Sequence, residues 1–314
     1  MSKQATREAL GDELLALGLE RQEVYVVDCD VSKSCKTMPF AHQCPAQHLN
    51  VGISEQNAVG IAAGLATAGK VPFVVTYAAF GSMRACEQIR QEVCYPRLNV
   101  KIACSHGGLT PANDGASHQC IEDMGIMRTL PNMTVIMPAD YHAARKLIRA
   151  AATYQGPVYL RFTRDPVEDL YGEEEEFEIG KAKYLRDGRD IAILANGDTV
   201  SLALHAAEQL DREGVSARVL DMHTIKPLDR EAVEKALTEC GCVITVEDHN
   251  ILNGLGSAVC EVAAEMGHGR VKRIGVLDRF GESAPYEALL ALNGITVENL
   301  CTTAHELLEQ EGKQ

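Results

Sequence analysis

Short apolar segments that alternate with longer helical stretches constrain this chain more than any other feature of its sequence. In the first half, the apolar segments are EVYVVDCD, VPFVVTY, NVKIACS, MTVIMPA and PVYLRF, which are rich in β-branched residues and short for helices. The stretches between them that we expect to be helical are residues 6–19, 55–68, 85–93 and 139–154. Because strands buried on both faces are nearly continuous in apolar residues, this alternation predicts a parallel sheet with helices on both faces.

The same alternation resumes near residue 190. The expected strands span residues 190–198, 216–222, 242–249 and 271–276, and the expected helices span residues 200–213, 229–238 and 254–266. The intervening segment carries the acidic run Glu173–Glu176, which is typical of a solvated linker. The sequence therefore predicts an α/β fold of two open, mainly parallel sheets. We expect a first domain of residues 1–168, a linker of 169–188 and a second domain of 189–314.

Charge and composition narrow the classes of partner. The net charge of −14 argues against nucleic acid, although it leaves room for a local basic pocket that binds a small anionic substrate. No run of about 18 apolar residues occurs, so we expect no membrane span. The amphipathic residues 1–20 predict a first helix and not a signal peptide. The 11 scattered cysteines indicate free thiols, so we expect a cytoplasmic protein.

Polar and glycine-rich segments follow the expected strands of the first domain. These segments are residues 28–37, 77–83, 105–118 and 161–164. In open parallel sheets, ligands bind beyond the carboxyl ends of the strands. The sequence therefore predicts a binding site at this edge of the first sheet.

The loop SHGGLTPANDGASHQC is the most informative of these segments. It carries His106, Asp114 and His118 among glycines that let the backbone turn tightly. A single histidine is more often a packing residue, but two histidines and an aspartate after a buried strand predict a binding loop. The spacing offers no close pair of ligands, so we expect no metal site in this chain.

Glu55 is a single carboxylate in the otherwise apolar stretch of residues 48–80. It stands at the start of a helix built from small residues. One interpretation is a helix-start carboxylate that the helix dipole stabilises. The other is a functional carboxyl group in an apolar setting, which favours its protonated form.

Three segments together resemble the transketolase family. They are NVGISEQNAVGIAAGLA, HGGLTPANDGASHQCIEDMGIMRTLPNMTVIMPAD and GPVYLRFTR, in this order. The resemblance covers nearly the whole chain and is to the carboxyl-terminal half of the family, a pyrimidine-binding domain followed by the transketolase C-terminal domain. It implies a thiamine diphosphate enzyme that transfers a two-carbon ketol unit from a ketose phosphate to an aldose.

The resemblance also implies roles for the cofactor-side residues. In the family, the glutamate that matches Glu55 hydrogen-bonds ring nitrogen N1′ of the aminopyrimidine and thereby promotes loss of the proton on C2. Phe80 matches the aromatic residue that packs on this ring, and Met83 replaces a second aromatic residue, as Cys86 replaces a tyrosine. A thioether can still pack on a ring face. Asp30 matches a loop near the thiazolium ring.

The substrate-side residues implied by the resemblance are Ser34, His106, Asp114, His118 and Arg164. In the family, the groups that match the serine, the histidines and the arginine contact the sugar phosphate or its hydroxyl groups. The group that matches the aspartate contacts a sugar hydroxyl. His118 is also expected to act catalytically. A planar guanidinium suits bidentate phosphate binding. Arg161 is an additional candidate for this role.

The family's Gly-Asp-Gly motif, which holds Mg²⁺ and the diphosphate, is not found in this sequence. The tripeptide Asn196–Asp198 lacks the second glycine and falls in the second domain. We therefore expect a split transketolase in which a separate amino-terminal subunit supplies the Mg²⁺ ligands. We also expect this chain to self-associate as a homodimer within an α₂β₂ assembly, which the second domain supports.

Other classes of function stay open on sequence alone. The β subunit of a 2-oxo-acid dehydrogenase decarboxylating component has the same domain order, and deoxyxylulose-phosphate synthase has a similar loop at residues 114–132. A non-catalytic regulatory subunit is a third alternative. A nucleotide-binding module is disfavoured because no G-x-G-x-x-G follows the first expected strand.

Overall fold

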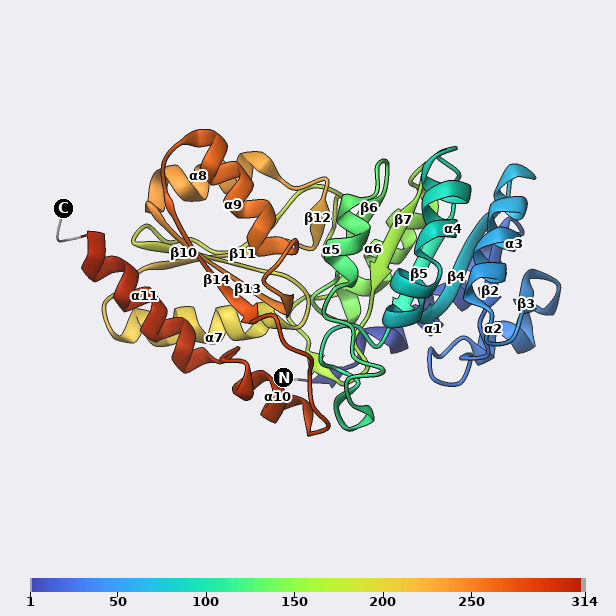
Figure 1. Ribbon diagram of the computed structural model, residues 1–314, viewed down its shortest axis with the longest axis horizontal. Helices are drawn as coiled ribbons and strands as arrows, with labels where there is room; N and C mark the ends of the chain where they lie inside the picture. The colour runs from blue at the N-terminus through green and yellow to red at the C-terminus, as the bar shows by residue number, and fades with distance from the viewer. Residues whose placement is uncertain (1, 312–314) are drawn as a thin grey trace.

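A computed structural model describes residues 2–311 of the chain as two α/β units side by side (Figure 1). The first sheet has the strand order β12-β6-β7-β5-β4-β2-β3, and the second has the order β14-β13-β10-β11-β9. The short strands β1 (Lys3–Gln4) and β8 (Val167–Glu168) form a separate antiparallel pair. The predicted fold class is confirmed, because the central strands of both sheets are parallel.

The first unit contains all the strands expected there. Its strands are β2 (Val24–Asp28), β3 (His48–Asn50), β4 (Val71–Tyr77), β5 (Lys101–Ser105), β6 (Thr134–Ile136), β7 (Val158–Arg161) and β12 (Thr224–Lys226). Its helices are α1 (Thr6–Glu20), α2 (Met38–Gln43), α3 (Glu55–Thr67), α4 (Cys86–Gln88), α5 (Asp123–Thr129) and α6 (Tyr141–Thr153).

Alternation along the strands builds a core on each face of the first sheet. Val26 of β2 packs in the same buried cluster as Leu147 of α6. Its neighbour Val27 points to the opposite face and packs in the cluster that contains Ala58 of α3. Each helix therefore covers the sheet with one apolar face. Within residues 2–311, no helix combines the length and apolarity needed to cross a membrane.

The second unit is a smaller sheet covered in the same way. Its strands are β9 (Lys183–Arg186), β10 (Ile191–Ala195), β11 (Ala217–Asp221), β13 (Cys242–Asn250) and β14 (Arg270–Val276). Helices α8 (Arg230–Cys240) and α9 (Leu255–Met266) cover one face, and α7 (Thr199–Arg212) and α11 (Val297–Glu311) cover the other (Figure 1). The short helix α10 (Tyr286–Leu292) precedes α11.

The structure differs from the expected boundaries in two respects. Strand β9 lies inside the segment 169–188 that we expected to be a linker, and it pairs antiparallel with β11. Strand β12 comes from the sequence of the second domain but joins the edge of the first sheet, antiparallel to β6. Because a strand of the second domain completes the first sheet, the two units are tied together structurally.

The expected helix of residues 85–93 is irregular. The short α4 lies between two π-helical turns, Phe80–Arg84 and Ile89–Cys94. π-helical turns inside helices occur frequently at functional sites, because the extra residue in the turn redirects side chains. Here the first turn begins at Phe80, one of the predicted cofactor-side residues.

Candidate active site

The order of the central strands brings the predicted site segments to one edge of the first sheet. Strands β2, β4, β5 and β7 are neighbours, and all run in the same direction. The segments that follow them therefore meet at the carboxyl edge, as open parallel sheets require. Most of the residues predicted from sequence lie at this edge, so it is where the geometry supports a site.

Glu55 is the first residue of α3, and its side chain is 2% exposed. Its setting is not wholly apolar, which corrects the expectation from sequence. Nη1 of Arg84 donates to its Oε2 at 2.8 Å. The guanidinium of Arg84 also lies over the ring of Phe80, 4.6 Å from its centre.

Four rings form a continuous aromatic group beside this pair. The ring of His106 stacks on Tyr77 with their centres 4.0 Å apart, and Tyr77 stacks on Phe80 at 5.9 Å. The half-buried His118 meets Phe80 edge to face at 5.7 Å. The structure therefore brings together three predicted residues, Phe80, His106 and His118, although they come from two different strand ends.

His106 is held in a constrained and buried position. Its side chain is 2% exposed and its φ is +63°, in the left-handed region. The ring Nδ1 lies 2.7 Å from the hydroxyl of Ser105. Burial, reinforced by the charges of Arg7 and Arg164, lowers the pKa of His106 to about 3. At neutral pH this histidine is uncharged and acts as a hydrogen-bonding group, not as a cation.

Two guanidinium groups flank His106. Nη1 of Arg7, from the first turn of α1, donates to the Ser34 carbonyl at 3.1 Å and lies 3.5 Å from Nε2 of His106. Nη1 of Arg164 contacts Oδ2 of Asp114 at 3.1 Å. Arg7 thus brings positive charge against His106, and Arg164 lies close enough to contribute to the lowered pKa of this histidine, within a protein of net charge −14.

Comparisons with known proteins match both units of the fold. A model of the transketolase pyrimidine binding domain matches residues 2–168, and one of the transketolase C-terminal domain matches residues 180–300. The chain belongs to the transketolase family. A putative transketolase C-terminal section from Methanocaldococcus jannaschii is 46% identical over 308 residues, which cover 97% of this chain and 96% of that protein.

Two further members of the transketolase family resemble the whole chain. One subunit of an apulose-4-phosphate transketolase from Phocaeicola vulgatus is 39% identical over 307 residues, covering 98% of each protein. The solved structure of a split gene transketolase, an inactive β4 tetramer, is 44% identical in sequence. It superposes with a TM-score of 0.90 over 98% of this chain and 99% of that one.

Three other residues that were singled out from sequence lie outside the group of four rings. Asp30 is exposed, has a φ of +66°, and accepts from Asn50 Nδ2 at 3.2 Å. Met83 has a side chain that is 45% exposed. Arg161 is fully buried, with its guanidinium engaged by backbone carbonyls, so it is not available to bind a phosphate.

Two arginines of this candidate site were not predicted from sequence. Arg7 stands in the first turn of an amphipathic helix, where a basic residue carries no special signal. Arg84 directly precedes the segment that we expected to be an ordinary helix from residue 85. The π-helical turn Phe80–Arg84 brings its side chain back over Phe80, a local distortion that hydrophobic periodicity does not reveal.

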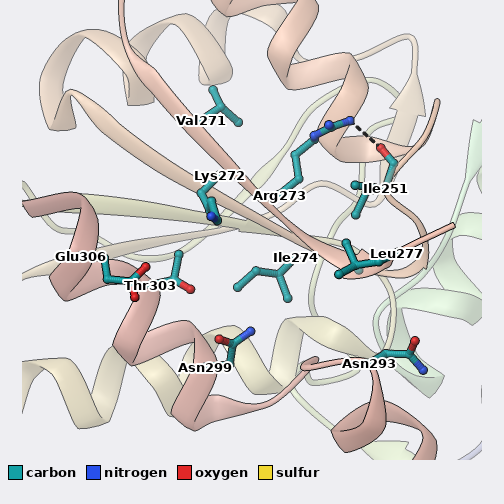
Figure 2. A pocket seen from close by; sticks show the side chains of 11 residues that line it. Ile251, Val271, Lys272, Arg273, Ile274, Leu277, Asn293, Asn299, Thr303 and Glu306 are labelled. Carbon is teal, nitrogen blue, oxygen red and sulfur yellow. Dashed lines mark hydrogen bonds between the residues drawn. The ribbon is translucent and has the colours of Figure 1, made fainter. Parts of the chain in front are cut away.

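A cavity of about 470 Å³ lies away from this site, against edge strand β14 and helix α11 (Figure 2). Figure 2 shows Arg273 turned away to the Ile251 carbonyl, to which it donates at 2.8 Å. The lining includes no histidine, cysteine or aspartate and none of the site residues. Among residues 2–311, no three His, Cys, Asp or Glu side chains are grouped to hold a metal ion.

Proposed function

We propose that this chain is the C-terminal subunit of a thiamine diphosphate-dependent transketolase. In this proposal, it transfers a two-carbon ketol unit from a ketose phosphate to an aldose, together with a separate diphosphate-binding subunit. The observation that carries the proposal is the arrangement of Glu55, Arg84 and Phe80. A buried carboxylate and the face of an aromatic ring both contact one planar cationic group.

That arrangement fits the aminopyrimidine ring of the cofactor. A guanidinium is planar, donates hydrogen bonds in its own plane and stacks on aromatic faces. A protonated aminopyrimidine has the same three properties. Arg84 therefore acts as a stand-in for the ring: the groups it contacts are those that would hold the aminopyrimidine. In this chain, Glu55 would contact the ring nitrogen and Phe80 the ring face.

The residues of this chain would then have separate roles toward the cofactor and the substrate. When bound, thiamine diphosphate supplies the nucleophilic carbon and the electron sink for moving a two-carbon unit. Glu55 would hold a proton at the ring nitrogen N1′, since its carboxyl already lies 2.8 Å from a planar cationic donor in this structure. The ring of His118 meets that of Phe80 edge to face, so it would lie beside a sugar seated at that ring. We propose that it exchanges protons with substrate hydroxyl groups.

The groups that would hold Mg²⁺ and the diphosphate are proposed to lie on a partner subunit. Among residues 2–311, no three His, Cys, Asp or Glu side chains are grouped to hold a metal ion, and the sequence has no Gly-Asp-Gly motif. The relatives of similar length are themselves named as a C-terminal section and as one subunit of a transketolase. We propose that two copies of this chain and two of the partner form an α₂β₂ assembly.

The anionic end of the substrate is proposed to bind near His106. Arg7 and Arg164 bring two guanidinium groups to this end of the edge, and Ser34 lies next to Arg7. Because His106 is neutral, the arginines carry the attraction for a phosphate. Asp114 holds Arg164 in place through their ion pair.

Replacing Arg164 with methionine is expected to raise the KM for a ketose phosphate donor by about 10- to 100-fold. The turnover number should change less, because the arginine would contact the remote end of the sugar. The measurement is steady-state kinetics of the reconstituted enzyme, with Arg186→Met as a matched control. Arg186 pairs with Asp211 on the surface of the second domain. Equal use of phosphorylated and unphosphorylated ketoses by the unmodified enzyme would rule out the phosphate role.

Replacing Arg84 with methionine is expected to tighten thiamine diphosphate binding about fivefold. The cofactor no longer has to displace the guanidinium from Glu55, and an ion pair whose arginine is 45% exposed is worth about 1 kcal/mol. Isothermal titration of the reconstituted complex with the cofactor measures this change. Arg90→Met serves as the control, because it removes an exposed arginine of the same segment, which donates to Gln91 at 2.9 Å. Weaker binding by the Arg84 variant would show that this arginine holds the cofactor and does not take its place.

A further inference from the structure

The second domain reaches the candidate active site through the carboxyl end of β13. The last residues of this strand, from Glu247 on, are buried. The amide of Asn250 donates to the Ile121 carbonyl at 2.8 Å, and Nε2 of His249 accepts from the Gly125 amide at 3.2 Å. We call the loop of residues 106–118 the sugar loop. These two hydrogen bonds attach the end of β13 to the segment that closely follows this loop.

Asp248 makes the most direct contact with the sugar loop. Both of its carboxyl oxygens accept from the Leu109 amide, at 3.0 and 2.9 Å, and Oδ2 also accepts from the Tyr286 hydroxyl at 3.2 Å. The side chain is fully buried. Burial, together with the Asp198 carboxyl, raises the pKa of Asp248 well above its ordinary value, which favours its neutral form. An asparagine would keep both this shape and an oxygen acceptor.

Arg161, from the first domain, donates hydrogen bonds beside the same loop. Its Nη2 donates to the Asp248 carbonyl at 2.7 Å and to the Cys120 carbonyl at 3.3 Å. Cys120 and Gly108 exchange two backbone hydrogen bonds, at 2.7 and 2.9 Å, which close the neck of the sugar loop. A Cβ added at Gly108 would stand 2.0 Å from the Asp248 carboxyl and 2.3 Å from Arg161. The close approach therefore requires glycine.

A second segment of the second domain holds the other side of the sugar loop. The side-chain amide of Gln119 donates to the Glu282 carbonyl at 2.8 Å. The hydroxyl of Ser283 donates to the Asn113 carbonyl at 2.5 Å. The loop that carries His106, Asp114 and His118 is thus fixed at its neck and at its tip by residues of the other domain.

We propose that Asp248 is a positioning residue: it fixes the sugar loop, so that the second domain sets the geometry in which substrate is bound. The effect on substrate rests on the proposed function of the site. The effect on the loop does not, because it follows from the hydrogen bonds to Leu109 alone. The polar contacts of Asp248 go to the loop backbone and to Tyr286, and not to the cofactor-side residues or the flanking arginines.

The first test is hydrogen–deuterium exchange of the full chain, followed by mass spectrometry of peptides that cover residues 106–120. Asp248→Ala is expected to speed exchange in these peptides by about tenfold or more, because the loop opens locally without its anchor. Asp248→Asn should restore protection close to that of the unmodified chain. Asp229→Ala is the matched control. Asp229 is a buried acceptor of the Ala232 and Ala182 amides in the same domain, remote from the loop in sequence and contacts.

The second test uses the complex with its partner, thiamine diphosphate and Mg²⁺. Asp248→Ala is expected to raise the KM for the ketose phosphate about tenfold, while exchange of the cofactor's C2 proton keeps the unmodified rate. Unchanged exchange in peptides 106–120 of the alanine variant would overturn the positioning role, as would equal loosening in the Asp229 control. If the unmodified complex transfers no ketol unit, the proposed function fails, and the peptide measurement still decides the role of Asp248.

Discussion

Replacing Glu55 with glutamine in the reconstituted enzyme is expected to lower turnover by about 10²–10⁴-fold. Glutamine keeps the size of the side chain and most of its hydrogen bonding, but it cannot hold or release the proton at the cofactor's ring nitrogen. Thiamine diphosphate should therefore still bind. Glu55→Ala should lower turnover at least as far and should also weaken cofactor binding, because it removes the contact altogether.

The matched control for this variant is Glu87→Gln. Glu87 lies in α4, a few residues beyond the π-helical turn, and its exposed carboxylate contacts Gln88. The same change of charge at this position should leave turnover within about twofold of the unmodified enzyme, since exposed polar substitutions have small effects. A comparable loss of turnover in both variants would assign the effect to charge or folding and not to the role of Glu55.

The purified chain alone is expected to show no detectable ketol transfer. Activity should appear when an amino-terminal subunit that carries the Gly-Asp-Gly motif is added with thiamine diphosphate and Mg²⁺. The physical reason is that, on the proposed function, this chain would hold the aminopyrimidine ring, whereas no three His, Cys, Asp or Glu side chains of residues 2–311 are grouped to hold a metal ion. Coupled assay of product formation, with and without the partner, measures the difference.

Two further observations would bear on the split-enzyme proposal. Titration of the partner against a fixed amount of this chain should saturate at equal molar amounts, and sedimentation should then show a species of the α₂β₂ mass. Robust activity from the chain alone would overturn the need for a partner. A chain that sediments as a monomer at micromolar concentration with the partner present would overturn the proposed assembly.

The edge of the sheet where the candidate site residues gather could be predicted from sequence, because it depends on topology. Parallel strands place their carboxyl ends at one edge, so segments after β2, β4, β5 and β7 had to meet. His106 and Phe80 accordingly lie in one aromatic group, connected through Tyr77. Short β-branched segments identify strands well, since burial on both faces leaves little choice of residue.

Contacts made by long side chains could not be predicted in this way. Arg7 and Arg84 have flexible stems, and their partners Ser34 and Glu55 are tens of residues away in the sequence. Periodicity predicts which face of a helix is apolar, but it does not predict which partner the guanidinium at the end of a long side chain contacts. Arg161 shows the converse case, because a strand-end arginine that suggested a phosphate contact is fully buried on backbone carbonyls.

The sequence also did not predict that a strand from the second domain would join the first sheet. β12 is three residues long and lies between two elements of the second domain, so its apolar pattern is too short to indicate a partner. Its antiparallel pairing with β6 is a long-range contact that only the assembled fold defines. The same holds for Asp248, whose bond to Leu109 joins residues of different domains.

The most direct test of the central claim is the rate at which the C2 proton of bound thiamine diphosphate exchanges with deuterium. The rate is measured by acid quench and proton NMR in the reconstituted complex, with no sugar substrate present. If Glu55 promotes loss of this proton, the Glu55→Gln complex should exchange about 10²–10⁴-fold more slowly than the unmodified complex at equal cofactor occupancy. An unchanged exchange rate in the glutamine variant would show that Glu55 is a helix-start carboxylate without a catalytic role.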